Sequence, residues 1–361
     1  MKKSKTIWVL LRSHVVNLPP IMTVMQCLLD FEEYEVKFIS TQDSGLNKEN
    51  FQEFILQQSH QVNKLRKLKN YIDYRSFVKK TLSKFASNED LIWLGSLDTA
   101  RACKGLEFLE TNEYILHLHE LYDTHRGLLE SIKPIAQKAK KVVSPEINRA
   151  AILQVWLELK ERPIVFPNKP YSHPRTKRMQ PTHEKTKAIL EKFATDKPII
   201  LYQGHIGGDR NLMPIAAAMK ELPEYEFWLM GPDHGYAESL VKVSNNIKYL
   251  GMVPAPFHLE ITSYASIGIM SYDLINLNNL YCAPNKVWEY CGFGIPFISN
   301  HCISLEILSE INKIGIVIYW TTEKFKNAVN IINQSYNLYM DKNKDFFEDN
   351  DIRSIVEGLL V

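Results

Sequence analysis

Short runs of apolar residues alternate along the chain with longer stretches in which apolar positions recur at helical spacing. This alternation is typical of β-α units built around parallel sheets. The runs fall into two sets of six, which predicts two sheets rather than one. The predicted strands are residues 7–11, 35–39, 91–94, 114–118, 141–143 and 164–166 in the first half, and 199–202, 226–230, 247–250, 267–270, 297–299 and 316–319 in the second.

A proline-rich stretch separates the two sets of strands. Pro167, Pro170 and Pro174 prevent a regular hydrogen-bonded ladder there. Most of the 15 glycines follow this stretch, which indicates that the second half is the one whose backbone approaches a ligand. We therefore expect an N-terminal domain over residues 1–167, a linker over 168–181, a ligand-binding domain over 182–340 and a C-terminal helix over 341–361.

Composition narrows the class of protein. Hydrophobic residues make up 45% of the 361 and charged residues 23%, which excludes collagenous and wholly disordered chains. The 43 basic residues nearly balance 41 acidic ones, so no overall field favours nucleic acid as the partner. The five cysteines are scattered without a C-x-x-C pair, which argues against a disulfide framework or a zinc site and predicts a cytoplasmic protein. No apolar run is long enough to span a bilayer, so any membrane contact is expected to be peripheral.

Residues 64–84 form a basic segment in the first half. Eight Lys and Arg residues accompany a single acid, Asp73, and apolar residues recur at roughly helical spacing. Such a helix either lies on an anionic membrane surface or packs one face on its domain with the basic face in water. The sequence leaves both interpretations open.

The strongest chemical signal is a short predicted helix that begins at Pro284. Proline is favoured at the start of a helix, and the glycines near residue 292 end it before the next strand. The free N–H groups and the dipole of such a helix start favour phosphate, and Lys286 adds positive charge beside Asn285. Glu289, one turn further on, suits the two hydroxyls of a ribose. The alternative is an ordinary αβ unit with Asn285 as a cap and Glu289 on the surface.

Two further loops follow predicted strands in the second half. Gly204, Gly207 and Gly208 would let backbone amides reach a phosphate, and Arg210 could bind it with two hydrogen bonds. The spacing fits neither G-x-G-x-x-G nor the P-loop, so a plain tight turn is an equal alternative. Gly231 ends another strand at the same expected crevice, where a turn alone would explain it.

The first half contributes candidates at the ends of two strands. His117 and His119 share one face of a strand, and we interpret His119 as facing substrate and His117 as structural. Arg12, Ser13 and His14 follow the first strand and would line the acceptor side of a cleft. No third ligand accompanies the histidines, so no metal site is predicted.

Together these pieces resemble the GT-B glycosyltransferases, and in particular members of glycosyltransferase family 4 from bacterial polysaccharide pathways. The resemblance rests on four ordered elements: "HLHELY" around His119, "YQGHIGGDRNL", "FWLMGPD" and "NNLYCAPNKVWEYCGFGIPFIS". It implies an α/β fold with two Rossmann-like domains whose parallel sheets face each other across a cleft. The C-terminal domain would hold a nucleotide-diphosphate sugar, the N-terminal domain over 1–167 would lie on the acceptor side, and the helix over 341–361 would return to that first domain, as in many GT-B chains.

The resemblance also implies roles for individual residues. Glu289 would bind the ribose, Lys286 and Arg210 the diphosphate, and His119, as the catalytic residue, the donor sugar. The sequence departs from the family at Tyr281, where the longer signature has an acid, and at His205, where many relatives have arginine. The implied nucleotide-sugar-binding residues are Gly204, His205, Gly207, Gly208, Arg210, Gly231, Asn279, Pro284, Asn285, Lys286 and Glu289.

The implied reaction is transfer of a hexosyl group, with retention of configuration, to a glycan, lipid-linked or protein-linked acceptor. The positively charged cradle would stabilise the departing nucleotide diphosphate without a metal or other cofactor, and the family favours UDP. The only D-x-D, at residues 349–351, is interpreted as a helix cap.

Two other functions remain open from the sequence. A non-catalytic subunit that supports a partner transferase is suggested by the departures at Tyr281 and His205. A nucleotide-sugar epimerase has the same architecture, but the motifs contain few carboxylates for acid/base chemistry. A nucleic-acid binder is not supported, because one basic segment in a near-neutral chain is too little.

Overall fold

The computed structural model describes residues 5–58 and 63–361. Contacts within the chain divide it into two compact units. Unit 1 comprises the chain up to Tyr171 together with Asp351–Val361, and unit 2 comprises Ser172–Asn350. The chain thus passes from one unit to the other inside the expected 168–181 linker, and it returns ten residues later than position 341.

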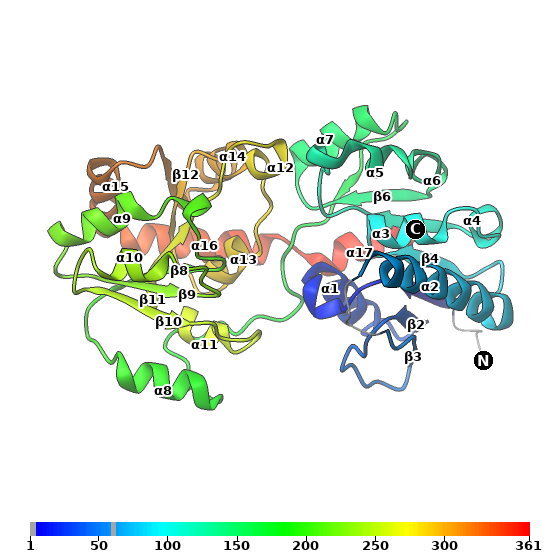
Figure 1. Cartoon of the computed structure of the whole chain (residues 1–361), viewed down its shortest axis with the longest axis horizontal. Helices are drawn as coiled ribbons and strands as arrows, with labels where there is room; N and C mark the ends of the chain where they lie inside the picture. The colour runs from blue at the N-terminus through cyan, green and yellow to red at the C-terminus, as the bar shows by residue number, and fades with distance from the viewer. Residues whose placement is uncertain (1–4, 59–62) are drawn as a thin grey trace. The chain divides into compact units, whose positions relative to one another are not determined.

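Unit 1 contains a parallel seven-stranded sheet of order β3-β2-β1-β4-β5-β6-β7 (Figure 1). The prediction of six strands was wrong here, because β3 (Phe51–Ile55) was missed. It is an edge strand with only partly buried apolar residues, so its hydrophobic signal is weak. The other strands are β1 (Lys5–Leu10), β2 (Tyr34–Ser40), β4 (Leu91–Leu94), β5 (Tyr114–His117), β6 (Lys141–Ser144) and β7 (Ile164–Val165).

Helices cover both faces of this sheet. On one face, Ile7 and Val9 pack into a core that includes residues of α1 and of the C-terminal helix α17, which lies against α1 (Figure 1). On the other face, Trp8 packs against Phe54, which in turn contacts Phe85 at the end of α2. The helices are α1 (Pro19–Leu28), α2 (Lys64–Phe85), α3 (Leu97–Cys103), α4 (Phe108–Thr111), α5 (Arg126–Glu130), α6 (Lys133–Lys138), α7 (Ile147–Trp156) and α17 (Ile352–Leu360).

Unit 2 contains a parallel six-stranded sheet of order β10-β9-β8-β11-β12-β13. All six strands predicted from the second half are present, and their ends agree with the prediction to within two residues. The observed bounds are β8 (Ile199–Gln203), β9 (Glu226–Met230), β10 (Ile247–Gly251), β11 (Ala265–Met270), β12 (Phe297–Asn300) and β13 (Gly315–Ile318).

Alternating residues of these strands enter two separate cores. Ile199 and Leu201 pack with α13 and α16 on one face, whereas Ile200 and Tyr202 pack with α9 and α15 on the other. The residues expected to form one C-terminal helix belong to two, α16 in unit 2 and α17 in unit 1. The helices of unit 2 are α8 (Glu184–Lys192), α9 (Met213–Ala218), α10 (Ala237–Val241), α11 (His258–Thr262), α12 (Leu277–Leu280), α13 (Asn285–Gly292), α14 (Ile303–Asn312), α15 (Thr322–Gln334) and α16 (Tyr336–Asp349).

Each sheet has one point at which the order of its strands reverses. The reversal lies between β1 and β4 in unit 1 and between β8 and β11 in unit 2. Loops leave the carboxyl ends of such neighbouring strands in opposite directions and open a crevice, which is where doubly wound α/β proteins bind ligands. Candidate site residues are therefore best sought after β8 and β11.

Candidate functional site

The loops that follow β8 and β9 approach each other through two glycines. The Gly204 N–H donates to the Met230 carbonyl at 2.9 Å. Gly204 and Gly231 have φ angles of +129° and +147°, in the region that favours glycine. A Cβ atom on Gly231 would lie 1.9 Å from the Gly204 oxygen. Both predicted glycines are therefore required by the backbone where unit 2 opens its crevice.

Helix α13 presents an open N-terminus, as predicted. Pro284 is its N-cap, and no side chain caps the helix there. The first N–H groups of an α-helix have no partner within the helix, so those of Asn285 and Lys286 can take an anion. The helix is held from its other side by Tyr290, whose hydroxyl lies 3.2 Å from the Leu201 carbonyl of β8.

Two cationic side chains converge beside this helix start. Lys286 Nζ lies 4.8 Å from the centre of the Tyr202 ring and 5.4 Å from that of Tyr272, and Arg210 Cζ also lies 5.4 Å from the Tyr272 ring. Burial, and the positive charge of Arg210, lower the pKa of Lys286 to about 8. Two neighbouring cations repel each other, and this arrangement becomes favourable when an anion lies between them.

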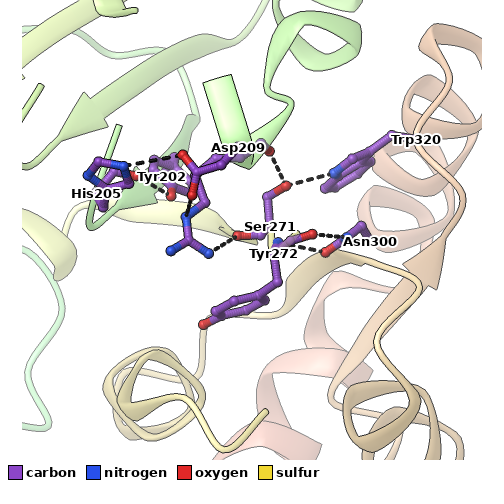
Figure 2. A network of polar contacts seen from close by, with 8 residues as sticks. Tyr202, His205, Asp209, Ser271, Tyr272, Asn300 and Trp320 are labelled. Carbon is purple, nitrogen blue, oxygen red and sulfur yellow. Dashed lines mark hydrogen bonds and ion pairs between the residues drawn. The ribbon is translucent and has the colours of Figure 1, made fainter. Parts of the chain in front are cut away.

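Arg210 and His205 are tied together by Asp209. The Asp209 carboxylate lies 3.2 Å from both Arg210 Nε and His205 Nε2, and Arg210 Nη1 is 3.5 Å from the Ser271 carbonyl (Figure 2). A Cβ on Gly207 would lie 2.6 Å from both Asp209 Oδ1 and His205 Nε2, so a larger residue here would require these two side chains to shift. The predicted residues of the loop thus form one cluster.

Glu289 is held by side chains that the sequence analysis did not identify. Its carboxylate accepts a hydrogen bond from Gln203 Nε2 and lies 3.3 Å from His258 Nε2. Thr262 in turn donates to Gln203 Oε1 at 2.6 Å. Burial raises the pKa of Glu289, but His258 and the charge of Lys286 outweigh it and hold the pKa below its usual value. Glu289 is therefore a charged, oriented acceptor rather than a surface residue.

Two predicted residues lie less centrally. Gly208 is exposed at the start of a short 3-10 turn, Gly208–Arg210. Asn279 lies on α12, where its N–H donates to Asn276 Oδ1 at 2.8 Å. Within the described residues, no hydrogen bond or ion pair joins Asn279 to Lys286, Arg210 or Glu289.

The candidates from the first half gather at the strand reversal of unit 1. Arg12, after β1, forms an ion pair with Asp98 at 2.5 Å, and its N–H donates to Thr99 Oγ1 at 2.9 Å. His14 precedes a 3-10 turn (Val15–Asn17), and the Ser13 hydroxyl is buried with no hydrogen-bond partner among the described residues.

His119 lies just beyond β5 with 8% of its surface exposed. Its Nε2 bonds the Gly95 carbonyl at 2.9 Å, so Nε2 carries the proton and Nδ1 is left as an acceptor. Burial lowers the pKa of His119 to about 4, which keeps the ring neutral at pH 7. The ring stacks on His117, which is fully buried. The substrate-facing role of His119 stays a prediction.

Several residues of the unit 2 cluster were missed by the sequence analysis, among them Gln203, Tyr272, Tyr202 and His258. Gln203 directly follows the predicted strand 199–202, and Tyr272 lies two residues after the predicted strand 267–270, so their position beyond carboxyl strand ends was a usable signal. Tyr202 had been counted only as part of a strand. His258 gave no signal, because only the packing of α11 against α13 brings it to Glu289.

The two parallel sheets, and the similarity to the solved structures below, show that this protein has the GT-B fold, which confirms the expected architecture. The sequence matches no protein-family model, and no curated protein matches it.

Several solved structures are similar to this protein over nearly its whole chain. Sucrose-phosphate synthase from Thermosynechococcus elongatus has a TM-score of 0.69 at 15% identity, covering 98% of this chain and 94% of its own. HepE from Anabaena, solved with UDP and glucose, has a TM-score of 0.70 at 12% identity, covering 98% of each chain. WaaG, a glycosyltransferase involved in lipopolysaccharide biosynthesis, has a TM-score of 0.62 at 14% identity, also covering 98% of each.

Proposed function

We propose that this chain is a glycosyltransferase that moves a hexosyl group from a nucleotide-diphosphate sugar to a glycan, lipid-linked or protein-linked acceptor. The observation that carries the proposal is the convergence of Lys286 and Arg210 on the uncapped start of α13. Positive charge and free N–H groups suit a diphosphate. Glu289, charged and oriented one turn further on, suits the ribose hydroxyls.

The proposed reaction breaks the bond between the anomeric carbon and the diphosphate oxygen. The acceptor oxygen forms its bond to the same face of the sugar, and the acceptor proton passes to the departing diphosphate. Lys286, Arg210 and the α13 amides offset the charge that develops on that leaving group, which is the task a metal performs elsewhere. No three His, Cys, Asp or Glu residues in the described part of the chain come together as metal ligands.

UDP is the proposed nucleotide. Its support is the presence of UDP or UDP-glucose in the HepE structures, which share the fold at 12–13% identity. The individual contacts to phosphate, ribose and sugar are proposals as well, and so is the donor-sugar contact of His119.

A thermal-shift panel tests this function. Nucleoside diphosphates and UDP-sugars that bind the native state raise its melting temperature. We expect a selective shift with UDP-sugars that Glu289→Ala abolishes and that the exposed control Glu224→Ala retains. If no nucleotide shifts the melting temperature, the proposal is contradicted and a non-catalytic subunit is favoured. The same conclusion follows if a nucleotide sugar binds but no free nucleotide diphosphate is released in the presence of acceptor glycans.

We further propose that α2 lies on an anionic membrane surface. Tyr74 and Val78 pack into unit 1, but Leu65, Leu68 and Ile72 have exposed fractions of 81%, 58% and 51% along one side of the helix. Basic residues surround this apolar stripe, as in helices that lie in a lipid interface. No helix among the described residues is long and apolar enough to cross a bilayer.

Vesicle sedimentation tests the membrane contact. The protein should bind vesicles that contain phosphatidylglycerol, and binding should weaken as salt screens the attraction. The double variant Leu68→Gln/Ile72→Gln should bind less, whereas Val155→Gln, at an exposed position of α7, should bind like wild type. Equal binding by both variants would overturn the assignment to α2.

A further inference from the structure

A cavity lies in unit 2 beside the proposed phosphate site. Its volume is about 510 Å³, within the roughly 300–1,000 Å³ of small-molecule pockets. It opens at the carboxyl ends of the central strands, and the 3-10 turn after β8 borders it. The side chains that give it chemical character are those of Asp209, Tyr272, Asp273, His301, Tyr319 and Trp320.

The walls of this cavity are fixed by hydrogen bonds. Trp320 Nε1 donates to Ser271 Oγ at 2.9 Å, and Ser271 Oγ donates to the Arg210 carbonyl (Figure 2). Asn300 donates to the Tyr272 carbonyl at 2.7 Å and accepts from the Tyr272 N–H at 3.0 Å. Loops from four strands are thereby held in place, so little conformational freedom would be lost when a ligand enters.

The lining combines aromatic rings with the carboxylate of Asp273. The rings of His301 and Tyr319 stack at 4.4 Å with an angle of 9° between them, and Tyr319 is 60% exposed. Asp273 makes no hydrogen bond or ion pair within the described residues, so its carboxylate is free to accept from hydroxyl groups. Aromatic surface for the C–H faces of a sugar and carboxylates for its hydroxyls are the groups that recognise carbohydrate.

This cavity differs in charge from the proposed phosphate site beside it. Lys286 and Arg210 attract phosphate, whereas Asp273 at the cavity repels it and Asp209 is already paired with Arg210 and His205. We propose that the cavity binds a neutral sugar unit of a glycan, separately from the nucleotide. This binding does not depend on the proposed transfer reaction, because the lining includes none of Lys286, Arg210 and Glu289 and shares only Gly208 with the implied nucleotide-sugar-binding residues.

Saturation-transfer NMR on the full chain tests this site. The probes are the methyl glycosides of glucose, galactose, mannose, rhamnose and N-acetylglucosamine, each with saturating UDP present. At least one glycoside should receive saturation, with UDP leaving the signal unchanged. Asp273→Ala and Tyr319→Ala should each weaken binding roughly two- to tenfold, since each removes one modest interaction, and the double variant should weaken it further. Ile311→Ala, an exposed position on α14, should bind like wild type.

Three results would overturn the proposal: no saturation of any of the five glycosides, a signal that UDP abolishes, or a signal that the double variant retains in full. Glu289→Ala distinguishes this site from the proposed nucleotide site. It should lose the thermal shift with UDP but keep the glycoside signal, so failure of the one binding event is seen independently of the other.

Discussion

At the residue scale, the surroundings of Lys286 disfavour its positive charge unless an anion is bound beside it. Burial and the nearby Arg210 both disfavour its charge, and the pKa of about 8 lies well below the usual 10.5. Glu289 opposes this effect but is itself held by Gln203 and His258. The unliganded protein therefore holds a destabilised cation at the start of α13, which a bound diphosphate would relieve.

Replacing Lys286 by methionine should weaken nucleotide binding and stabilise the free protein. Loss of a charge-assisted contact costs about 1.5–3 kcal/mol, or roughly ten- to a hundredfold in Kd. In wild type, nucleotide affinity should fall as pH rises through about 8, because Lys286 loses its proton. Titration calorimetry from pH 7 to 9 measures both the loss of affinity in Lys286→Met and the pH dependence of the wild-type Kd.

The stability of the free protein follows from the same pKa. Between about 8 and 10.5 the unfolded chain binds the Lys286 proton and the native state does not, so this residue makes stability rise with pH in that range. Below pH 8 its destabilising effect is complete. Lys286→Met should remove that pH dependence, and an unchanged profile would show that another group causes it.

At the element scale, the contact between the ends of β8 and β9 shapes the opening of the crevice. Gly204 and Gly231 touch where these strands end, and the loop after β8 then carries Arg210 toward Lys286. A shift of either strand end would separate the two cations. The geometry of the proposed phosphate site thus depends on the close approach of the backbone at Gly204 and Gly231, which a side chain on Gly231 would block.

Gly231→Ala should be strongly destabilising. Its Cβ would collide with the Gly204 oxygen, and the positive φ adds strain, so we expect a loss of more than about 2 kcal/mol in chemical denaturation. Gly235→Ala is the matched control. Its φ is +90° but no atom lies within 4 Å of the added Cβ, so only the conformational cost of about 1 kcal/mol applies. Equal losses would mean that the collision is relieved by movement of the loop.

At the scale of the whole molecule, unit 1 is assembled from both ends of the chain. Helix α17 buries Ile352, Val356 and Leu359 in the core that β1 and α1 form. Asp351, the last residue of the D-x-D, caps this helix by accepting from the Arg353 N–H at 2.9 Å, as the sequence analysis expected. The C-terminal segment is therefore part of the fold of unit 1.

Leu359→Ala should destabilise unit 1 selectively. Truncating a buried leucine costs about 2–5 kcal/mol because it leaves a cavity. Hydrogen exchange should show faster exchange in β1, β2 and β4, with β8, β9 and β11 unchanged. Val155→Ala, at an exposed position of α7, should leave both units as in wild type. Equal acceleration in both sheets would show that the units unfold together.

The sequence by itself predicted the two sheets, because twelve of their thirteen strands appear as short apolar runs. It also identified residues that need a special backbone conformation or a charge. Buried parallel strands are apolar on both faces, so their signal is local and strong. Gly204, Gly231, Pro284 and Lys286 could be singled out as well, because their residue types and their places after predicted strands or at a predicted helix start are visible in the sequence.

Only the tertiary structure decided how these residues act together. The edge strand β3 was missed because half-buried strands lack that signal. The partnership of Glu289 with His258, the cavity between Asp273 and Tyr319, and the division of the C-terminal segment into α16 and α17 all depend on packing between elements distant in sequence. Hydrophobic period specifies where an element faces the core, but not which side chains from other elements meet it there.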